Sequence, residues 1–239
     1  MSALKRFFVD KIEDTVALLG EEFEHAKNVL RIGVGDEVIL LDNSGKEYTA
    51  LVAQVEKKRM LLNIVRSEVG AREASEEIRL FFGYLKNADK NEFIVQKAVE
   101  LGVKKIGVFS SEFSSAYINE NKLERLNKVA KEATKQCLRA VAPKIEYFST
   151  LEKALAEGAH CQNKLFACEF AEKSEIQIAS LQGSTAIVIG SEGGFSKAEA
   201  DLAQKNGYAL VSLGKRILRA ETAAVALTSI VAFSLGELG

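Results

Sequence analysis

The sequence has no excess of charge of either sign, few cysteines and no long apolar run. Its 32 Lys and Arg residues oppose 33 Asp and Glu residues, leaving a net charge of −1. This balance excludes a protein that coats nucleic acid with a uniformly basic surface, so any RNA site must be a local patch. An apolar content of 47% is typical of a globular chain with a substantial core.

Three cysteines, Cys137, Cys161 and Cys168, lie at irregular spacing. An odd number of scattered cysteines argues against a disulfide framework and favours a reducing compartment. Neither His160-Cys161 nor Cys168 belongs to a paired C-x-x-C element, so no metal site is predicted. We expect buried, unreactive thiols.

The longest apolar stretch, Ala223–Leu235, is too short to span a bilayer and contains Thr228, Ser229 and Ser234. The first ten residues, Met1–Asp10, lack the apolar run of a signal peptide. We therefore expect a cytoplasmic protein without a membrane partner.

Residues 1–70 are typical of a small β-rich module, because short strand-like pieces alternate with turn signals. The strand-like pieces are Val38–Leu41, Tyr48–Ala53 and Met60–Val65. A polar stretch, Ser67–Glu77, then interrupts the apolar pattern. The sequence predicts a first domain over residues 1–70 and a second over 71–239.

From Ile78 onward, strand runs alternate with helical patterns, which indicates an α/β domain. The predicted strands are Ile78–Leu85, Lys105–Phe109, Ile145–Phe148, Leu165–Cys168, Ala186–Ile189 and Ala209–Leu213. The predicted helices include Glu92–Leu101 and Lys122–Ala140. Ser196 and Glu199 form a capping box that predicts a further helix start, and Glu221-Thr222 begins the last helix. Because threaded chains are rare, these patterns alone predict an ordinary open sheet.

Two glycine-rich strand ends, Ile187–Ser196 and Val211–Ala223, lie close together in the sequence. The first lacks the G-x-G-x-x-G spacing of dinucleotide sites. The second would need glycine at 209 and Ser or Thr at 216 to cradle phosphate, but Ala209 and Arg216 stand there. Either loop alone could be a tight turn. Together they favour a site for a flat polar ligand.

The motifs IGSEGGFS (189–196) and LGKRILRAETAA (213–224) resemble those of the SPOUT-class methyltransferases that modify N3 of a uridine in bacterial 16S ribosomal RNA. The resemblance extends over both halves of the chain. It also includes RFF (6–8), HAKNVLR (25–31), QKAVELGV (96–103) and EATKQCLR (132–139). Two departures are Ser191, where the family usually has proline, and Cys137-Leu138, which replace small residues.

This resemblance implies a trefoil-knotted SPOUT α/β domain preceded by a PUA-like β-barrel domain that binds RNA. Phe166–Phe170, Gly190–Gly194 and Leu213–Arg219 would then converge on S-adenosylmethionine, with the adenine ring against Leu213, Ile217 and Leu218. The implied cofactor-binding set is Glu169, Ile189, Gly190, Glu192, Gly193, Gly194, Leu213, Gly214, Ile217, Leu218, Arg219, Thr222 and Ala223.

Methylation of uridine N3 requires removal of the N3 proton, and donors on the flanking carbonyls would stabilise the resulting anion. Arg219 is the first candidate for that donor. Glu192 or Glu221 could take the proton, although Glu221 could equally be a helix cap. By the resemblance Arg139 lies near the substrate, either in the same copy or across a dimer interface, whereas from the residue type alone it would be a solvated charge.

The resemblance predicts that Arg6, His25, Lys27 and Arg31 hold RNA in the first domain. Lys86, Lys90, Lys97 and Arg139 would contact RNA from the second, although each lysine could be an ordinary solvated residue. The apolar helix Thr222–Leu235 must be buried, and by the resemblance it packs against a second copy in a homodimer.

The function predicted from the sequence is S-adenosylmethionine-dependent methylation of uridine N3 in 16S ribosomal RNA. The partners are that RNA or the small ribosomal subunit, and not DNA. Two alternatives stay open: an inactive RNA-binding protein of the same fold, or a nucleotide-dependent enzyme that acts on small molecules.

Overall fold

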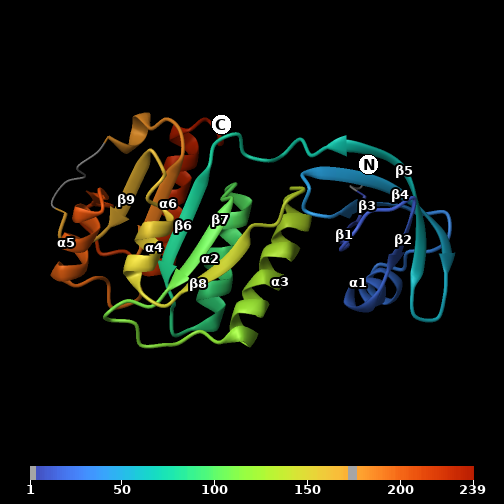
Figure 1. Cartoon of the computed structure of the whole chain (residues 1–239), viewed down its shortest axis with the longest axis horizontal. Helices are drawn as coiled ribbons and strands as arrows, with labels where there is room; N and C mark the ends of the chain where they lie inside the picture. The colour runs from blue at the N-terminus through green and yellow to red at the C-terminus, as the bar shows by residue number, and fades with distance from the viewer. Residues whose placement is uncertain (1–3, 172–176) are drawn as a thin grey trace. The chain divides into compact units, whose positions relative to one another are not determined.

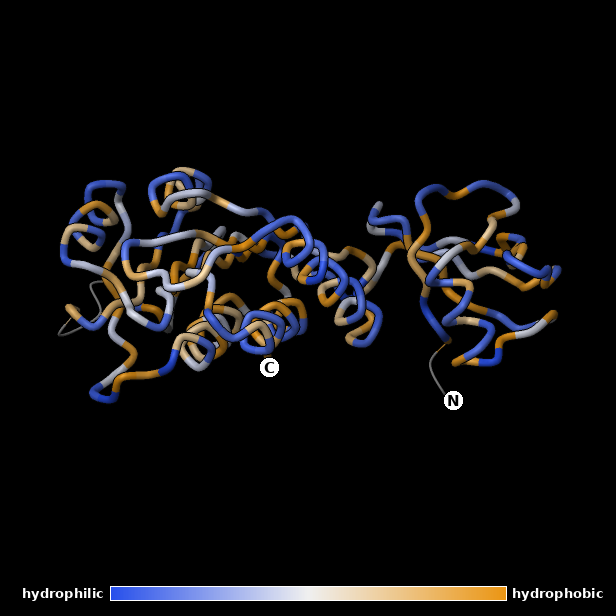
Figure 2. The backbone as a smooth tube through the Cα atoms, turned by 90° about the horizontal axis from the view of Figure 1, so that it is seen from below, coloured by the Kyte–Doolittle hydropathy of each residue, from blue (hydrophilic) through white to orange (hydrophobic). Residues whose placement is uncertain are grey.

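The computed structural model describes residues 4–171 and 177–239, which form two compact units. The first unit contains the chain up to Glu73 together with Thr134–Ala142, and the second contains Ala74–Ala133 and Pro143–Gly239. In the hydropathy-coloured backbone of Figure 2, hydrophobic and hydrophilic stretches alternate in both units, as expected of elements that bury one face. Within the described ranges, no helix combines the length and apolar character needed to cross a membrane.

The first unit is built on a five-stranded sheet with the order β1-β3-β4-β5-β2. Its strands are β1 (Arg6–Phe8), β2 (Thr15–Leu18), β3 (Glu37–Leu41), β4 (Lys46–Val55) and β5 (Met60–Val69). β1 pairs with β3 in parallel, and the other pairs are antiparallel. A short helix α1 (Gly20–Glu24) continues into a π-helical turn η1 (His25–Val29).

Alternation along these strands puts one set of side chains into a core that includes Phe7, Leu18, Phe23, Leu40 and Leu62. The predicted strands β3, β4 and β5 are confirmed, and β1 and β2 are additional. The predicted strand Met60–Val65 is longer in the structure. β5 continues to Val69 because Ser67, Glu68 and Val69 pair with β4.

The second unit is a six-stranded parallel sheet with the order β11-β9-β10-β6-β7-β8 (Figure 1). Its strands are β6 (Ile78–Gly83), β7 (Lys105–Phe109), β8 (Lys144–Phe148), β9 (Asn163–Ala167), β10 (Thr185–Ile189) and β11 (Ala209–Val211). β10 is buried along its whole length, which explains its uninterrupted apolar run. All six predicted strands are confirmed, although β11 ends before Ser212 and Leu213.

The helices of this unit are α2 (Ala88–Glu100), α3 (Glu120–Gln136), α4 (Leu151–Glu157), α5 (Lys197–Lys205) and α6 (Ala220–Ser234), with a short 3-10 turn η2 (Ile178–Ser180). The capping box at Ser196 and Glu199 is confirmed at the start of α5. α2 begins before the predicted Glu92 because the Asn87 side chain caps it by accepting from the Asp89 N–H. α3 ends before the predicted Ala140, and Leu138 then adopts a positive φ of 64°.

The helix α6 is buried along one face and exposed along the other. Ala224, Leu227, Thr228, Val231 and Ala232 face the interior of the unit. On the opposite side Ile230 is 42% exposed and Phe233 69% exposed. The sequence predicts that α6 is buried around its circumference, but within this chain only one face of the helix is covered.

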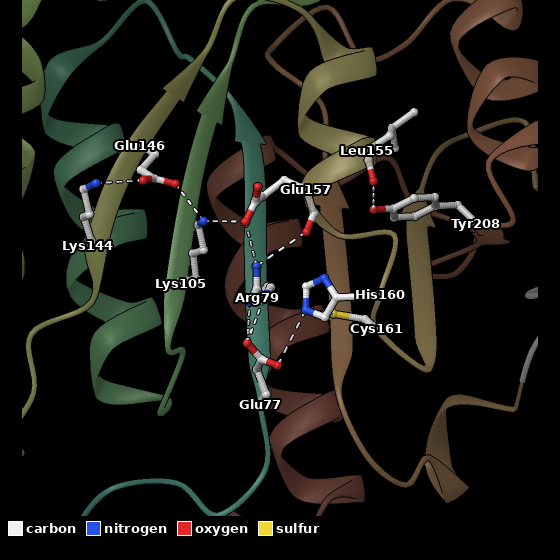
Figure 3. A network of polar contacts seen from close by, with 10 residues as sticks. All are labelled: Glu77, Arg79, Lys105, Lys144, Glu146, Leu155, Glu157, His160, Cys161 and Tyr208. Atoms are coloured by element: carbon white, nitrogen blue, oxygen red, sulfur yellow. Dashed lines mark hydrogen bonds and ion pairs between the residues drawn. The ribbon is translucent and has the colours of Figure 1, made fainter. Parts of the chain in front are cut away.

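An ion-pair network holds the amino-terminal ends of β6, β7 and β8 (Figure 3). Lys105 lies between the carboxylates of Glu146 and Glu157, and Arg79 donates to Glu157 at 2.9 Å. The lysine contacts lower the pKa of both glutamates below its ordinary value. The network tethers α4 to the sheet at the edge opposite the carboxyl ends of the strands.

Tyr208 anchors α4 from the other side, because its hydroxyl donates to the Leu155 carbonyl at 2.9 Å. Nearby, Cys161 is buried as predicted, and burial raises the pKa of its thiol. Cys137 and Cys168 are half-buried.

Candidate functional site: a cavity at the carboxyl ends of β9, β10 and β11

A cavity of about 690 Å³ lies where β9, β10 and β11 end. In a parallel sheet these ends share one edge, where loops leave backbone groups available to a ligand. The lining comes mainly from the segments predicted to converge. It consists of Lys90, Ala167, Cys168, Glu169, Ala171, Ile189–Phe195, Val211–Glu221 and Ala223. Its size suits a ligand as large as a nucleoside derivative.

Two glycines allow the tight backbone turn of the loop that follows β10. A Cβ on Gly190 would come within 3.1 Å of the Gly194 backbone, and Gly194 itself has a φ of +67°. Ser191 and Gly194 close the turn through a bridge. Both glycines line the cavity. The closely spaced backbone segments that they permit are therefore part of the cavity wall.

Apolar and polar surfaces meet in the cavity. Ile189, Leu213, Ile217 and Leu218 supply apolar atoms. Ile217 is 88% exposed, which is an unusual place for isoleucine unless a ligand covers it. These residues form an apolar wall beside main-chain N–H and C=O groups, the surroundings that suit a flat heteroaromatic ring.

An ion pair lies at the start of α6, where Lys90 Nζ contacts Glu221 Oε1 at 2.9 Å. Both residues line the cavity. The second carboxylate oxygen, Oε2, is buried and has no hydrogen-bond partner in the described structure. An unpartnered buried carboxylate oxygen is costly, so this atom marks a place where a ligand donor would be stabilising.

The charge state of Glu221 follows from opposing effects. Burial would raise the pKa of Glu221, but the hydrogen bond from Lys90, its own N–H and the charges of Lys90 and Arg219 outweigh burial. The resulting pKa lies below the ordinary value, so the carboxylate is anionic at neutral pH. Arg219 is the N-cap residue of α6 and is exposed at the cavity.

Glu192 lies in different surroundings. Its Oε1 accepts a hydrogen bond from the Lys86 main-chain N–H at 2.9 Å, and the residue is exposed. The contact ties the glycine loop to the segment that follows β6.

Known proteins share both the motifs and the architecture. Residues 72–232 match the RNA methyltransferase domain family, and residues 18–65 match the RNA methyltransferase PUA domain family. The first match alone covers more than half of the chain. The chain belongs to the RNA methyltransferase family. The family resemblance drawn from the sequence motifs is confirmed, as is the combination of a PUA-like sheet with a SPOUT-type parallel α/β sheet.

Individual relatives agree over nearly the full length. The chain is 32% identical to the ribosomal RNA small subunit methyltransferase E of Mesomycoplasma hyopneumoniae, over 93% of this chain and 96% of that one. It is 29% identical to the Bacillus subtilis protein of the same name, over 96% of each. The Neisseria gonorrhoeae protein of that name, solved bound to S-adenosyl methionine, has a TM-score of 0.83 at 27% identity, over 98% of each chain.

Of the residues predicted to bind a cofactor in this RNA methyltransferase, all line the cavity except Thr222. Thr222 is exposed in the first turn of α6. Lys90, which the sequence assigned to RNA, lines the cavity and pairs with Glu221. No sequence pattern could have predicted this pairing, because the two residues lie on different helices.

Ser191 takes the place of the usual family proline and is buried. Its hydroxyl donates to the Phe113 carbonyl at 3.4 Å, a contact that proline could not make. The substitution therefore links the glycine loop to the segment between β7 and α3.

The RNA-binding candidates of the first unit divide between two places. His25, Lys27 and Arg31 lie along η1 and directly after it, with Lys27 over the Phe23 ring and His25 edge-on to Phe7. Arg6 alternates with Phe7 on β1, so its side chain points to the other face of the sheet. There it pairs with Glu47 at 2.7 Å, and its side chain is 9% exposed.

Arg139 lies after the end of α3, in the segment that belongs to the first unit. It is 3% exposed, so the interpretation as a solvated charge is wrong. Its Nη2 contacts Glu73 at 2.9 Å, and the other Glu73 oxygen accepts from the Ala140 and Val141 N–H groups. Of the remaining candidates, Lys86 is exposed and Lys97 pairs with Glu100 at 2.8 Å.

Proposed function

We propose that this protein transfers a methyl group from S-adenosylmethionine to N3 of a uridine in 16S ribosomal RNA of the small subunit. The observation that carries the proposal is the cavity at the carboxyl ends of β9, β10 and β11, built from glycine loops and an apolar wall. The names of the relatives and the bound cofactor of the Neisseria gonorrhoeae protein support it. Such a reaction places the protein in the cytoplasm, where small subunits are assembled.

The residues of the cavity fit the proposed cofactor. Main-chain groups of Gly190–Gly194 and Leu213–Arg219 would read the edge of an adenine ring, and Leu213, Ile217 and Leu218 would cover its faces. When bound, S-adenosylmethionine supplies an electrophilic methyl group on a sulfonium centre. Any side chain at Gly190 would collide with the loop and narrow this wall.

Arg219 is proposed to stabilise the uridine as N3 loses its proton. A guanidinium beside a uridine carbonyl favours the anionic form of the ring, because the negative charge spreads onto the carbonyl oxygens. The exposed position of Arg219 at the cavity mouth leaves its donors available to the substrate.

Glu221 is proposed to accept the N3–H, in preference to Glu192. The Glu221 Oε2 atom is buried and unpartnered, whereas Glu192 already accepts from the Lys86 N–H and is exposed to water. Lys90 keeps Glu221 anionic and oriented. The proton then passes from the Glu221 carboxyl group to water.

A second copy of the chain is proposed to cover the exposed face of α6. Ile230 and Phe233 form part of an apolar stripe on a surface helix, which is a typical site of self-association. In a two-fold dimer the stripes of the two copies would pack against each other, so the same residues would be buried in both copies.

The test uses purified protein, isotopically labelled S-adenosylmethionine and small subunits from cells that lack the gene. We expect label in N3-methyluridine of 16S ribosomal RNA, identified by mass spectrometry of nuclease digests. Cofactor binding without transfer to subunits or naked RNA would favour the inactive RNA-binding alternative. Binding of NAD or ATP with no affinity for RNA would instead favour a small-molecule enzyme.

A further inference from the structure

The segment between β7 and α3, residues 110–119, presents two aromatic side chains to solvent. Phe113 is 46% exposed and Tyr117 is 76% exposed. The rest of this segment is rich in serine, with Ser110, Ser111, Ser114 and Ser115. The two rings therefore stand on a polar loop rather than within a continuous apolar patch. We call Phe113 and Tyr117 the aromatic shelf.

The aromatic shelf is fixed to the glycine loop of the cavity. A Cβ on Gly193 would lie only 2.6 Å from the Phe113 Cβ, and the Ser191 hydroxyl donates to the Phe113 carbonyl. The neighbouring Glu112 N–H donates to Glu199 Oε1 at 2.8 Å. Gly193 lines the cavity and Phe113 does not, so Phe113 touches this loop from outside the cavity.

One lysine lies beside the shelf, and a second lies on the segment that is bound to the glycine loop. Lys122 Nζ donates to the Tyr117 carbonyl at 2.8 Å and lies 5.4 Å from the centre of the Tyr84 ring. The main chain of Lys86 binds Glu192 of the glycine loop. Both lysines are exposed, and neither forms a salt bridge within residues 4–171 and 177–239. Their charges are available to an anionic partner.

We propose that the aromatic shelf stacks an unpaired base of the RNA segment that carries the target uridine, while Lys86 and Lys122 contact its phosphates. Exposed aromatic rings interleaved with cations are the surface that single-stranded RNA requires, because every base has a π-face and every nucleotide a charge. A protein partner would need a continuous apolar core, which the serines interrupt. This proposal rests on the proposed function and adds the side chains that hold the substrate.

The chain contains no tryptophan, so Phe113→Trp gives a single indole reporter at the shelf. We expect small subunits lacking the modification, or a 16S ribosomal RNA fragment, to quench its emission, and S-adenosylmethionine alone to leave it unchanged. Phe93→Trp is the matched control, since Phe93 is 43% exposed and belongs to a different element, α2. Equal quenching of both reporters, or none at position 113, would overturn the proposal.

Steady-state kinetics supply the second measurement. Phe113→Ala should raise KM for small subunits about tenfold, within the range that base stacking contributes, with kcat and cofactor Kd unchanged. Phe113→Tyr should restore KM and Phe113→Leu should not, since only tyrosine keeps a π-face. If Phe113→Leu matches the wild type, stacking is wrong although the proposed methyl transfer stands. If the wild type itself transfers no methyl group, the proposed function fails first.

Discussion

The two oxygens of the Glu221 carboxylate lie in different surroundings, and this difference matters for the proposed chemistry. One oxygen is held by Lys90, and the other is buried without a partner at the cavity. Arg219, two residues earlier, is exposed at the same cavity. In the proposed mechanism, the carboxylate of Glu221 would accept the proton and the guanidinium of Arg219 would stabilise the anion.

Arg219→Ala is expected to leave the cofactor Kd within about twofold of the wild type while kcat falls 10²- to 10³-fold, roughly the loss seen when one anion-stabilising donor is removed. Isothermal calorimetry measures the first quantity and single-turnover methyl transfer the second. Glu221→Gln should also lower kcat, whereas Glu192→Gln should not. Unchanged turnover in Arg219→Ala would remove this residue from the mechanism.

At the scale of elements, the last turn of α3 and the segment after it contribute charged side chains to the first unit. Lys135 pairs with Glu22 at 3.1 Å, and Arg139 pairs with Glu73. The Glu73 carboxylate is desolvated by burial, yet Arg139 and two main-chain N–H groups lower the pKa of Glu73. These contacts make Arg139 a residue that positions the segment, and any role near the substrate would have to act through that position.

Arg139→Met should destabilise the first unit by about 3 kcal/mol, because it leaves the Glu73 carboxylate without its cation in a mostly buried place. Urea unfolding followed by circular dichroism measures the change. Arg125→Met is the control: Arg125 pairs with Glu92 on an exposed surface, and its loss should leave the free energy of unfolding nearly unchanged. Equal effects of the two substitutions would contradict a buried structural role.

The ion-pair network at the amino-terminal edge of the sheet makes stability depend on acid pH. Glu146 and Glu157 have pKa values below the ordinary 4.5 because Lys105 contacts both. A lowered pKa in the folded state stabilises the fold above pH 4.5, and this contribution is lost as pH falls through the folded values. Both side chains are about one third exposed, so solvent screening limits the effect.

Between pH 6 and pH 3, the wild type should lose about 1 kcal/mol more stability than the Glu146→Gln, Glu157→Gln double variant. Thermal unfolding at fixed ionic strength across this range measures the difference. An identical pH dependence in both proteins would mean that the network contributes nothing to acid sensitivity.

For the whole molecule, the exposed stripe of α6 bears on assembly. Phe233 is 69% exposed on a helix whose opposite face is fully packed. An aromatic ring in this position gains most from a partner that removes it from water. The proposed homodimer therefore depends on few side chains.

Phe233→Asp should convert a dimer to a monomer in light scattering at micromolar concentration, since a carboxylate would be buried unpaired in the interface. Val34→Asp in the first unit is the control, because Val34 is 66% exposed and its substitution should leave the mass unchanged. A monomeric wild type at the same concentration would contradict the dimer.

The motifs indicated the family, and local patterns predicted many of the strands and helices of the second unit. Apolar runs predicted all six strands of its sheet, and the Ser196–Glu199 capping box predicted the start of α5. These features depend on neighbours in the chain, so the sequence contains them directly. β1 and β2 were missed because three or four residues carry too little periodicity. The threading of the chain through a knot stays a prediction of the resemblance.

The sequence by itself determined the glycine loops, the elements that carry them and the chemical class they indicate. Only the tertiary structure decided that Lys90 faces Glu221, that Arg139 is buried against Glu73, and that Phe113 packs on Gly193. Each of these contacts joins residues separated by dozens of positions. Their meeting depends on strand order and on the turns between elements, neither of which leaves a periodic signal in the chain.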